Sequence, residues 1–165
     1  MKRSISITLI LTLAALLLVT FIGINYYSQR DEVFPFRCST FSHYDLSRKE
    51  GERIDFLVTQ DLRFEKNNAG YLLLNGQVNG GDSTTLLNRR IVLIGGGKTG
   101  ADTYRYKIDK IITSSTDTTP DALFNLLLAE ITLDPSYLQL DVDRVDDNTY
   151  LIGGPLSYLF TCQRY

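Results

Sequence analysis

The sequence has few of the residue types on which many catalytic sites depend. Its 165 residues include no tryptophan, one methionine, one histidine and two cysteines. A Ser-His-Asp or Cys-His site would therefore have to use the single histidine, His43. His43 lies in the stretch FSHYD, which is predicted to be a loop, and a surface histidine is the simpler interpretation. The sequence thus predicts a protein that is not an enzyme and has no cofactor.

Charge is absent from one long segment near the N-terminus. No charged residue occurs from Ile5 to Ile24, whereas Lys2 and Arg3 precede this run. Twenty helical residues span roughly 30 Å, the thickness of the hydrocarbon core of a bilayer. We therefore predict a cytoplasmic tail over residues 1–4, a transmembrane signal anchor over residues 5–25 and an outer domain over residues 26–165.

Two other interpretations of this segment stay open, a cleaved signal peptide and a buried soluble helix. A cleaved signal has a shorter apolar region and a small-x-small cleavage site, and the trailing FIGINYYSQ offers no convincing pair of small residues. Basic residues before an anchor remain in the cytoplasm. In a bacterium, this orientation makes the chain a single-pass inner-membrane protein with a periplasmic C-terminal domain.

The outer domain also lacks an excess of basic charge. It holds 15 of the 17 basic residues and all 19 acidic ones, for a net charge of −4. No basic stripe stands out, so the composition argues against direct binding of nucleic acid.

The two cysteines, Cys38 and Cys162, lie near the two ends of the outer domain. An even cysteine count in an oxidising compartment predicts a disulfide. Two buried free thiols are the alternative.

The outer domain shows no βαβ alternation and no internal repeat. Apolar and polar residues alternate in several segments, which predicts strands around residues 34–41, 53–66, 71–79, 84–94, 103–112 and 137–145. One helix is predicted over residues 120–131, with Thr119 as its cap. The fold class is therefore mainly β with one helix (α+β), in which an antiparallel sheet curls into a barrel or a sandwich.

A glycine-rich stretch, Gly95–Gly100, fits the dinucleotide-binding pattern G-x-G-x-x-G. That pattern needs a helix after the glycines, because the helix N-terminus binds the pyrophosphate. The following segment ADTYRYKIDKI has a period of two and predicts a strand instead. We therefore interpret the glycines as a flexible hairpin loop between two antiparallel strands.

Two further groups of residues suggest sites. Asp141, Asp143, Asp146 and Asp147 resemble a metal cluster, but the EF-hand spacing fails, and a solvated strand face followed by a turn explains them better. Aromatic residues are more informative, since small barrels can enclose an apolar ligand. An apolar ligand cavity or interface, with ordinary barrel core as the alternative, is predicted at Phe56, Val58, Tyr71, Tyr104, Tyr106 and Ile108.

The opening MKRSISITLILTL and the cysteines within FPFRCST and SYLFTCQRY resemble the FidL-like membrane proteins of enterobacteria. The layout is also similar to that of ToxS and other small partners of membrane-bound transcription activators. The resemblance implies that the periplasmic domain pairs with that of a ToxR-like activator, whose winged-helix domain is cytoplasmic. It also implies a lipocalin-like barrel and a bile-salt-like or lipid-like ligand.

Two hypotheses from other classes remain beside this one. The first is a stand-alone periplasmic module that binds a lipid-like ligand. The second is an envelope enzyme, which the missing catalytic residues disfavour.

Overall fold

The computed structural model describes residues 12–24, 34–46, 53–81 and 83–165. The predicted tail and the first part of the predicted anchor lie outside these ranges, as do residues 25–33. Residues 12–24 form a helix. Within the described ranges, no helix combines the length and the apolar content needed to cross a membrane. The anchor over residues 5–25 therefore stays a prediction.

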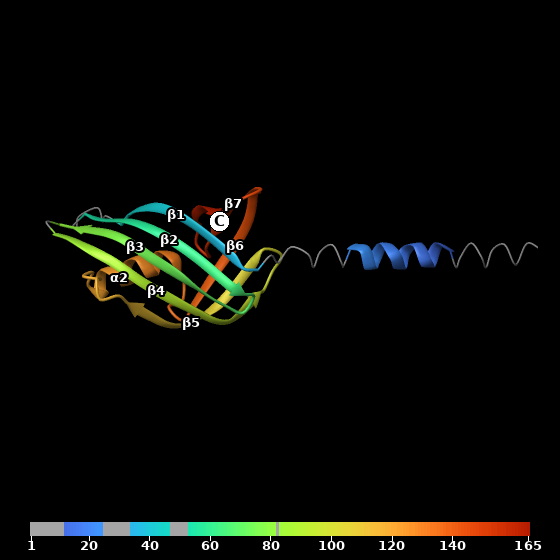
Figure 1. Cartoon of the computed structure of the whole chain (residues 1–165), viewed down its shortest axis with the longest axis horizontal. Coiled ribbons are helices and arrows are strands. Elements are labelled where there is room, and N and C mark those ends of the chain that lie inside the picture. The colour runs from blue at the N-terminus through green and yellow to red at the C-terminus, as the bar shows by residue number, and fades with distance from the viewer. Residues whose placement is uncertain (1–11, 25–33, 47–52, 82) are drawn as a thin grey trace, which may run out of the picture. The chain divides into compact units, whose positions relative to one another are not determined.

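Residues 34–165 form a separate compact unit built on eight antiparallel strands that close into a barrel in chain order (Figure 1). The prediction of a mainly β fold is confirmed, and of its two alternatives the barrel is the correct one. The strands are β1 (Phe36–Asp45), β2 (Ile54–Lys66), β3 (Ala69–Gly80), β4 (Ser83–Lys98), β5 (Thr103–Thr113), β6 (Tyr137–Asp146), β7 (Thr149–Gly153) and β8 (Tyr158–Arg164).

The alternation in the sequence places one face of each long strand inside the barrel. On β2, every second residue from Phe56 to Phe64 is buried, and β4 buries Leu87, Ile91 and Leu93 in the same way. Side chains on a strand point to opposite faces in turn, so these rows form the inner wall.

The predicted soluble helix is α2 (Asp121–Ile131), which lies between β5 and β6 in the chain. Figure 1 shows it at the end of the barrel where the long strands β2, β3 and β4 extend furthest. The helix packs into the barrel core through Phe124, Leu127, Leu128 and Ile131. The prediction that Thr119 caps it is wrong, since Pro120 occupies the N-cap position. The Thr119 hydroxyl instead lies 3.2 Å from that of Thr85 on β4.

The glycine stretch departs in part from its prediction as a hairpin loop. Gly95, Gly96 and Gly97 lie inside β4, and the connection to β5 is made by residues 99–102. Gly95 has a φ of 59°, and the β4–β5 register shifts between Ile94 and Gly97. The left-handed region favours glycine because it has no Cβ, so these residues form a bulge rather than a flexible loop.

The barrel wall is complete at one end only. β1 pairs with β8 at Cys38 and Ser39 but pairs with β2 along its whole length to Asp45. Similarly, β5 runs to Thr113 but pairs with β6 only as far as Lys107. At the end that contains α2, the described wall is therefore a curved sheet of β1 to β5 with two free edges.

Candidate functional site

The six residues of the predicted apolar cavity do not all face the interior. Phe56, Val58 and Tyr106 are buried, and Tyr104 and Ile108 are half-buried against the same core. The ring of Tyr106 stacks on Phe64 at 4.5 Å between centroids, which fills this part of the barrel. Most of the predicted group is therefore ordinary core packing.

Tyr71 is the exception. Leu72 and Leu74 are buried on the inner face of β3, so Tyr71, which precedes Leu72, points to the outer face. Its ring lies on the outer face near two guanidinium groups. The Cζ atom of Arg90 is 4.7 Å from the ring centroid, and that of Arg63 is 5.9 Å from it. Tyr71 therefore belongs to a cation–aromatic cluster on the outer face of the sheet.

The incomplete wall beside β1 contains a polar cluster of Ser42, Tyr44 and Gln60. Gln60 is 1% exposed, and its Nε2 donates to the Ser42 hydroxyl oxygen at 2.9 Å and to the Tyr44 hydroxyl oxygen at 2.7 Å. Ser42 and Tyr44 are half-buried. Burial raises the pKa of the Tyr44 hydroxyl, and the hydrogen bonds with Gln60 and Ser42 oppose this rise. The cluster thus lies between the core and the free edge of β1.

A buried ion pair fixes α2 against the barrel. The Arg89 guanidinium points inward from β4, stacks over the Phe124 ring at 4.5 Å and contacts the Asp117 carboxylate at 3.1 Å. It also donates to the carbonyl oxygen of Thr119 and, at 2.7 Å, to the carboxylate of Asp121. Arg89 therefore connects the inner wall to the loop and first turn that precede the buried face of α2.

A disulfide joins the two strands that close the barrel. The sulfur atoms of Cys38 on β1 and Cys162 on β8 lie 2.13 Å apart, in agreement with the predicted bridge. Both cysteines are buried. The bridge reinforces a seam where only Cys38 and Ser39 of β1 pair with β8.

The family model described as "FidL-like putative membrane protein" matches residues 76–162, more than half of the chain. The chain belongs to the FidL-like family. This membership confirms the resemblance drawn from the termini, although the matched span includes neither the N-terminal segment nor Cys38. No curated protein matches the chain.

The FidL-like span covers α2, Arg89 and the free edge of β5 but leaves out β1 and all of β2. The polar cluster of Ser42, Tyr44 and Gln60 therefore lies outside the span that the family model matches. Sequence analysis missed both Arg89 and Gln60. Both could have been found from the alternation of the strands. Gln60 follows Val58 by two positions and Arg89 follows Leu87 by two, so each polar residue shares a face with apolar residues that point inward.

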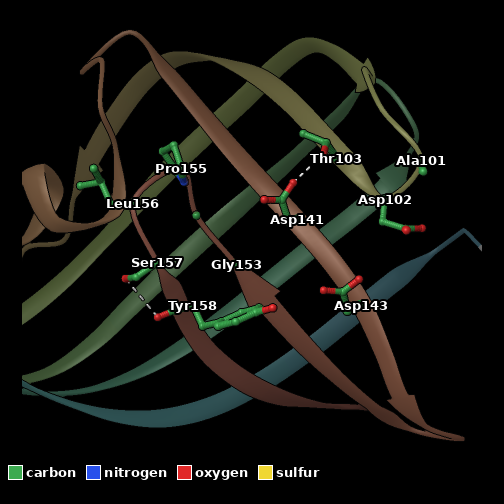
Figure 2. Close-up of a pocket in the computed structure, with 11 residues that line it drawn as sticks. Ala101, Asp102, Thr103, Asp141, Asp143, Gly153, Pro155, Leu156, Ser157 and Tyr158 are labelled. Carbon is green, nitrogen blue, oxygen red and sulfur yellow. Dashed lines mark hydrogen bonds between the residues drawn. The ribbon is translucent and has the colours of Figure 1, made fainter.

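A groove of about 480 Å³ lies on the outer face of this FidL-like barrel (Figure 2). The Thr103 hydroxyl donates to Asp141 at 2.5 Å, and Leu156 and Tyr158 are exposed at its rim. The groove is lined by Ala101, Asp102, Thr103, Asp141, Asp143, Gly153, Gly154, Pro155, Leu156, Ser157 and Tyr158.

The residues considered as catalytic or metal-binding candidates lie apart from one another. Asp141 and Asp143 line the groove, whereas Asp147 lies in the turn after β6 and pairs with Arg144 at 2.9 Å. In the described part of the chain, no three potential metal ligands gather into a group. His43 lies on β1 rather than in a loop, half exposed, with its Nε2 3.1 Å from the Asp55 carboxylate.

Proposed function

We propose that this FidL-like protein is a non-enzymatic, bitopic inner-membrane protein whose barrel binds and stabilises the periplasmic domain of a ToxR-like transcription activator. The proposal combines the family membership with one observation, the free edge of β5. The predicted anchor would place the barrel in the periplasm, where it can contact the periplasmic domain of such an activator. Its predicted orientation can be tested with a periplasm-active reporter fused after Tyr165.

The free edge consists of Asp109–Thr113. Lys110–Thr113 pair with β4 on one side, and among the described residues no backbone hydrogen bond leaves Asp109–Thr113 on the other side. Ile111 and Ile112 are exposed by 36% and 43%. A strand edge with open backbone groups and exposed isoleucines is a template for an added strand.

Strand addition accounts for both parts of the proposed role. A strand from the activator would satisfy the open backbone groups of β5 and cover Ile111 and Ile112. Because the barrel would bind the folded activator and not the unfolded chain, docking would raise the population of folded activator by mass action. The partner's level in the cell is therefore the natural measurement.

The test compares a gene deletion with two substitutions in the full chain. Deletion should lower the level of the activator and the output of its promoters. Ile112→Lys should reproduce this loss, because a charged residue on an edge blocks pairing with another strand. Thr59→Lys, on the exposed face of β2 within the sheet, should not. An activator level that is unchanged by the deletion would contradict the proposal.

A second candidate function is a stand-alone periplasmic module for a lipid-like or bile-salt-like ligand. The half-buried polar cluster beside the incomplete wall favours it, because ligand sites combine apolar walls with a few polar groups. Ligand binding is also compatible with the first function, in which the ligand would modulate the contact with the activator.

A further inference from the structure

Gln60 is a polar residue in a row of otherwise apolar, inward-facing side chains on β2. Its neighbours on the same face of β2 are Val58 and Leu62, and its register partner on β3 is Leu74. All three apolar side chains are buried, and Gln60 itself is 1% exposed. A primary amide in such a position needs hydrogen-bond partners for every polar atom, because it cannot reach bulk water.

The hydrogen-bond count of the Gln60 amide is incomplete. Its two N–H groups are both used, one by the Ser42 hydroxyl oxygen and one by the Tyr44 hydroxyl oxygen. Its carbonyl oxygen, Oε1, is buried and accepts no hydrogen bond from the described residues. Oε1 therefore still needs a hydrogen-bond donor from outside the described residues.

The wall beside this amide gives such a donor a route. From Thr40 to Asp45, β1 has β2 as its only strand partner in the described part of the chain, since its pairing with β8 ends at Ser39. Ser42 and Tyr44 are half-buried rather than enclosed. An approaching group would pass the free edge of β1 and meet the two hydroxyls before it reached the amide.

We propose that Gln60, with Ser42 and Tyr44, is the polar subsite for a small amphiphile that carries a hydroxyl group on an apolar body. The hydroxyl donates to Oε1 of Gln60, and its own oxygen can accept from the hydroxyl of Ser42 or Tyr44. The apolar body lies at the free edge of β1, against the half-buried ring of Tyr44. An ether or a carboxylate of the same shape lacks the donor and is disfavoured.

This inference deepens the second candidate function and does not rest on the activator as partner. If ligand binding fails and the deletion still lowers the activator, only the inference is lost. If the deletion has no effect and a hydroxyl-bearing probe binds at Gln60, the activator proposal is lost instead.

The experiment uses the full chain in phospholipid nanodiscs and two aromatic probes. One is 2-naphthol, which has a hydroxyl donor, and the other is 2-methoxynaphthalene, which has the same ring system and no donor. The side-chain amide signals of Gln60 are followed by nuclear magnetic resonance during each titration. We expect a saturable shift with 2-naphthol and about tenfold weaker binding of 2-methoxynaphthalene, which corresponds to about 1.4 kcal/mol.

Two substitutions separate the subsite from general apolar binding. Gln60→Leu keeps a similar volume and removes the acceptor. It should therefore weaken the binding of 2-naphthol about tenfold and leave the binding of 2-methoxynaphthalene nearly unchanged. Gln77→Leu, at an exposed glutamine on β3, should leave both affinities as in the wild type. If Gln60→Leu does not fold, the comparison of the two probes on the wild-type chain decides alone.

Equal affinity for the two probes would overturn the proposal, as would a Gln60 signal that neither probe moves. The second result would mean that only water satisfies Oε1. Unchanged 2-naphthol binding in folded Gln60→Leu would overturn it as well.

Discussion

At the scale of single residues, Arg89 has the largest predicted effect on stability. Its side chain is 5% exposed and that of Asp117 is 2% exposed, so both charges are out of water. Removing one partner of a buried pair leaves the other charge uncompensated. We predict that Arg89→Met lowers the free energy of unfolding by about 3 kcal/mol. Arg90→Met, at the exposed neighbouring position, should cost less than about 1 kcal/mol. Denaturant titration measures both free energies of unfolding. Equal losses in the two variants would contradict the assignment of Arg89 to a buried ion pair.

The same pair predicts a pH dependence. Burial raises the pKa of Asp117, but hydrogen bonds from Arg89 and from the backbone N–H groups of Asn88 and Thr119 outweigh it, so the pKa of this carboxyl is lowered from its usual value. A lowered carboxyl pKa stabilises the folded state above the pKa of the unfolded chain, and this contribution disappears as the pH falls through the folded value. Between about pH 4 and pH 2, the wild type should therefore lose more stability than Asp117→Asn. An equal loss of stability in the wild type and in Asp117→Asn would contradict the assignment of this pH dependence to Asp117.

Two adjacent glycines differ in what they tolerate. A Cβ on Gly96 would lie 2.3 Å from the carbonyl oxygen of Arg105, whereas a Cβ on Gly97 would meet nothing within 4 Å. Gly96→Ala should cost about 1–3 kcal/mol, because the β5 backbone would have to move. Gly97→Ala should stay within about 0.5 kcal/mol of the wild type. Thermal unfolding of the two variants checks this, and similar melting temperatures would show that the close approach is not limiting.

The residues that sequence analysis missed were visible in part. The positions of Gln60 and Arg89 in apolar rows are enough to predict that both side chains point inward. Their partners were not predictable, because Asp117 lies in a loop whose path depends on where α2 docks. The glycines show the same limit, since the pattern identifies a special backbone but does not distinguish a bulge from a loop.

At the scale of elements, the disulfide holds the weakest seam of the barrel. It connects β1 to β8 across a sequence separation of 124 residues. We predict that the Cys38→Ser and Cys162→Ser double variant loses up to roughly 5 kcal/mol, since the bridge restricts a long loop in the unfolded chain. In the wild type, neither cysteine should react with a thiol reagent until the protein is unfolded with reductant. Ready labelling without reductant would remove the bridge from the account.

The strands and the helix were predictable because each depends on local pattern. Period-two alternation located most of the long strands, and an apolar segment after Pro120 located α2. The local pattern left a barrel and a sandwich as alternatives, because closure depends on two residue pairs between β1 and β8 at opposite ends of the domain. The free edge of β5 is likewise a consequence of where β6 starts pairing, and no local pattern encodes it.

At the scale of the whole molecule, the eight strands close into a barrel whose described wall leaves two free edges, one on β1 and one on β5. The free edge of β5 combines open backbone groups with exposed isoleucines, and it lies within the span that the family model matches. An interface there would give the barrel a role in binding another protein.

Site-specific photo-cross-linking in native membranes tests the proposed interface most directly. A photoreactive residue at Ile112, on the free edge, should capture a membrane-bound protein with a winged-helix domain, identified by mass spectrometry. The same residue at Thr59, on β2, should not capture it. Absence of that protein from the Ile112 cross-links, or equal capture from both positions, would contradict the account.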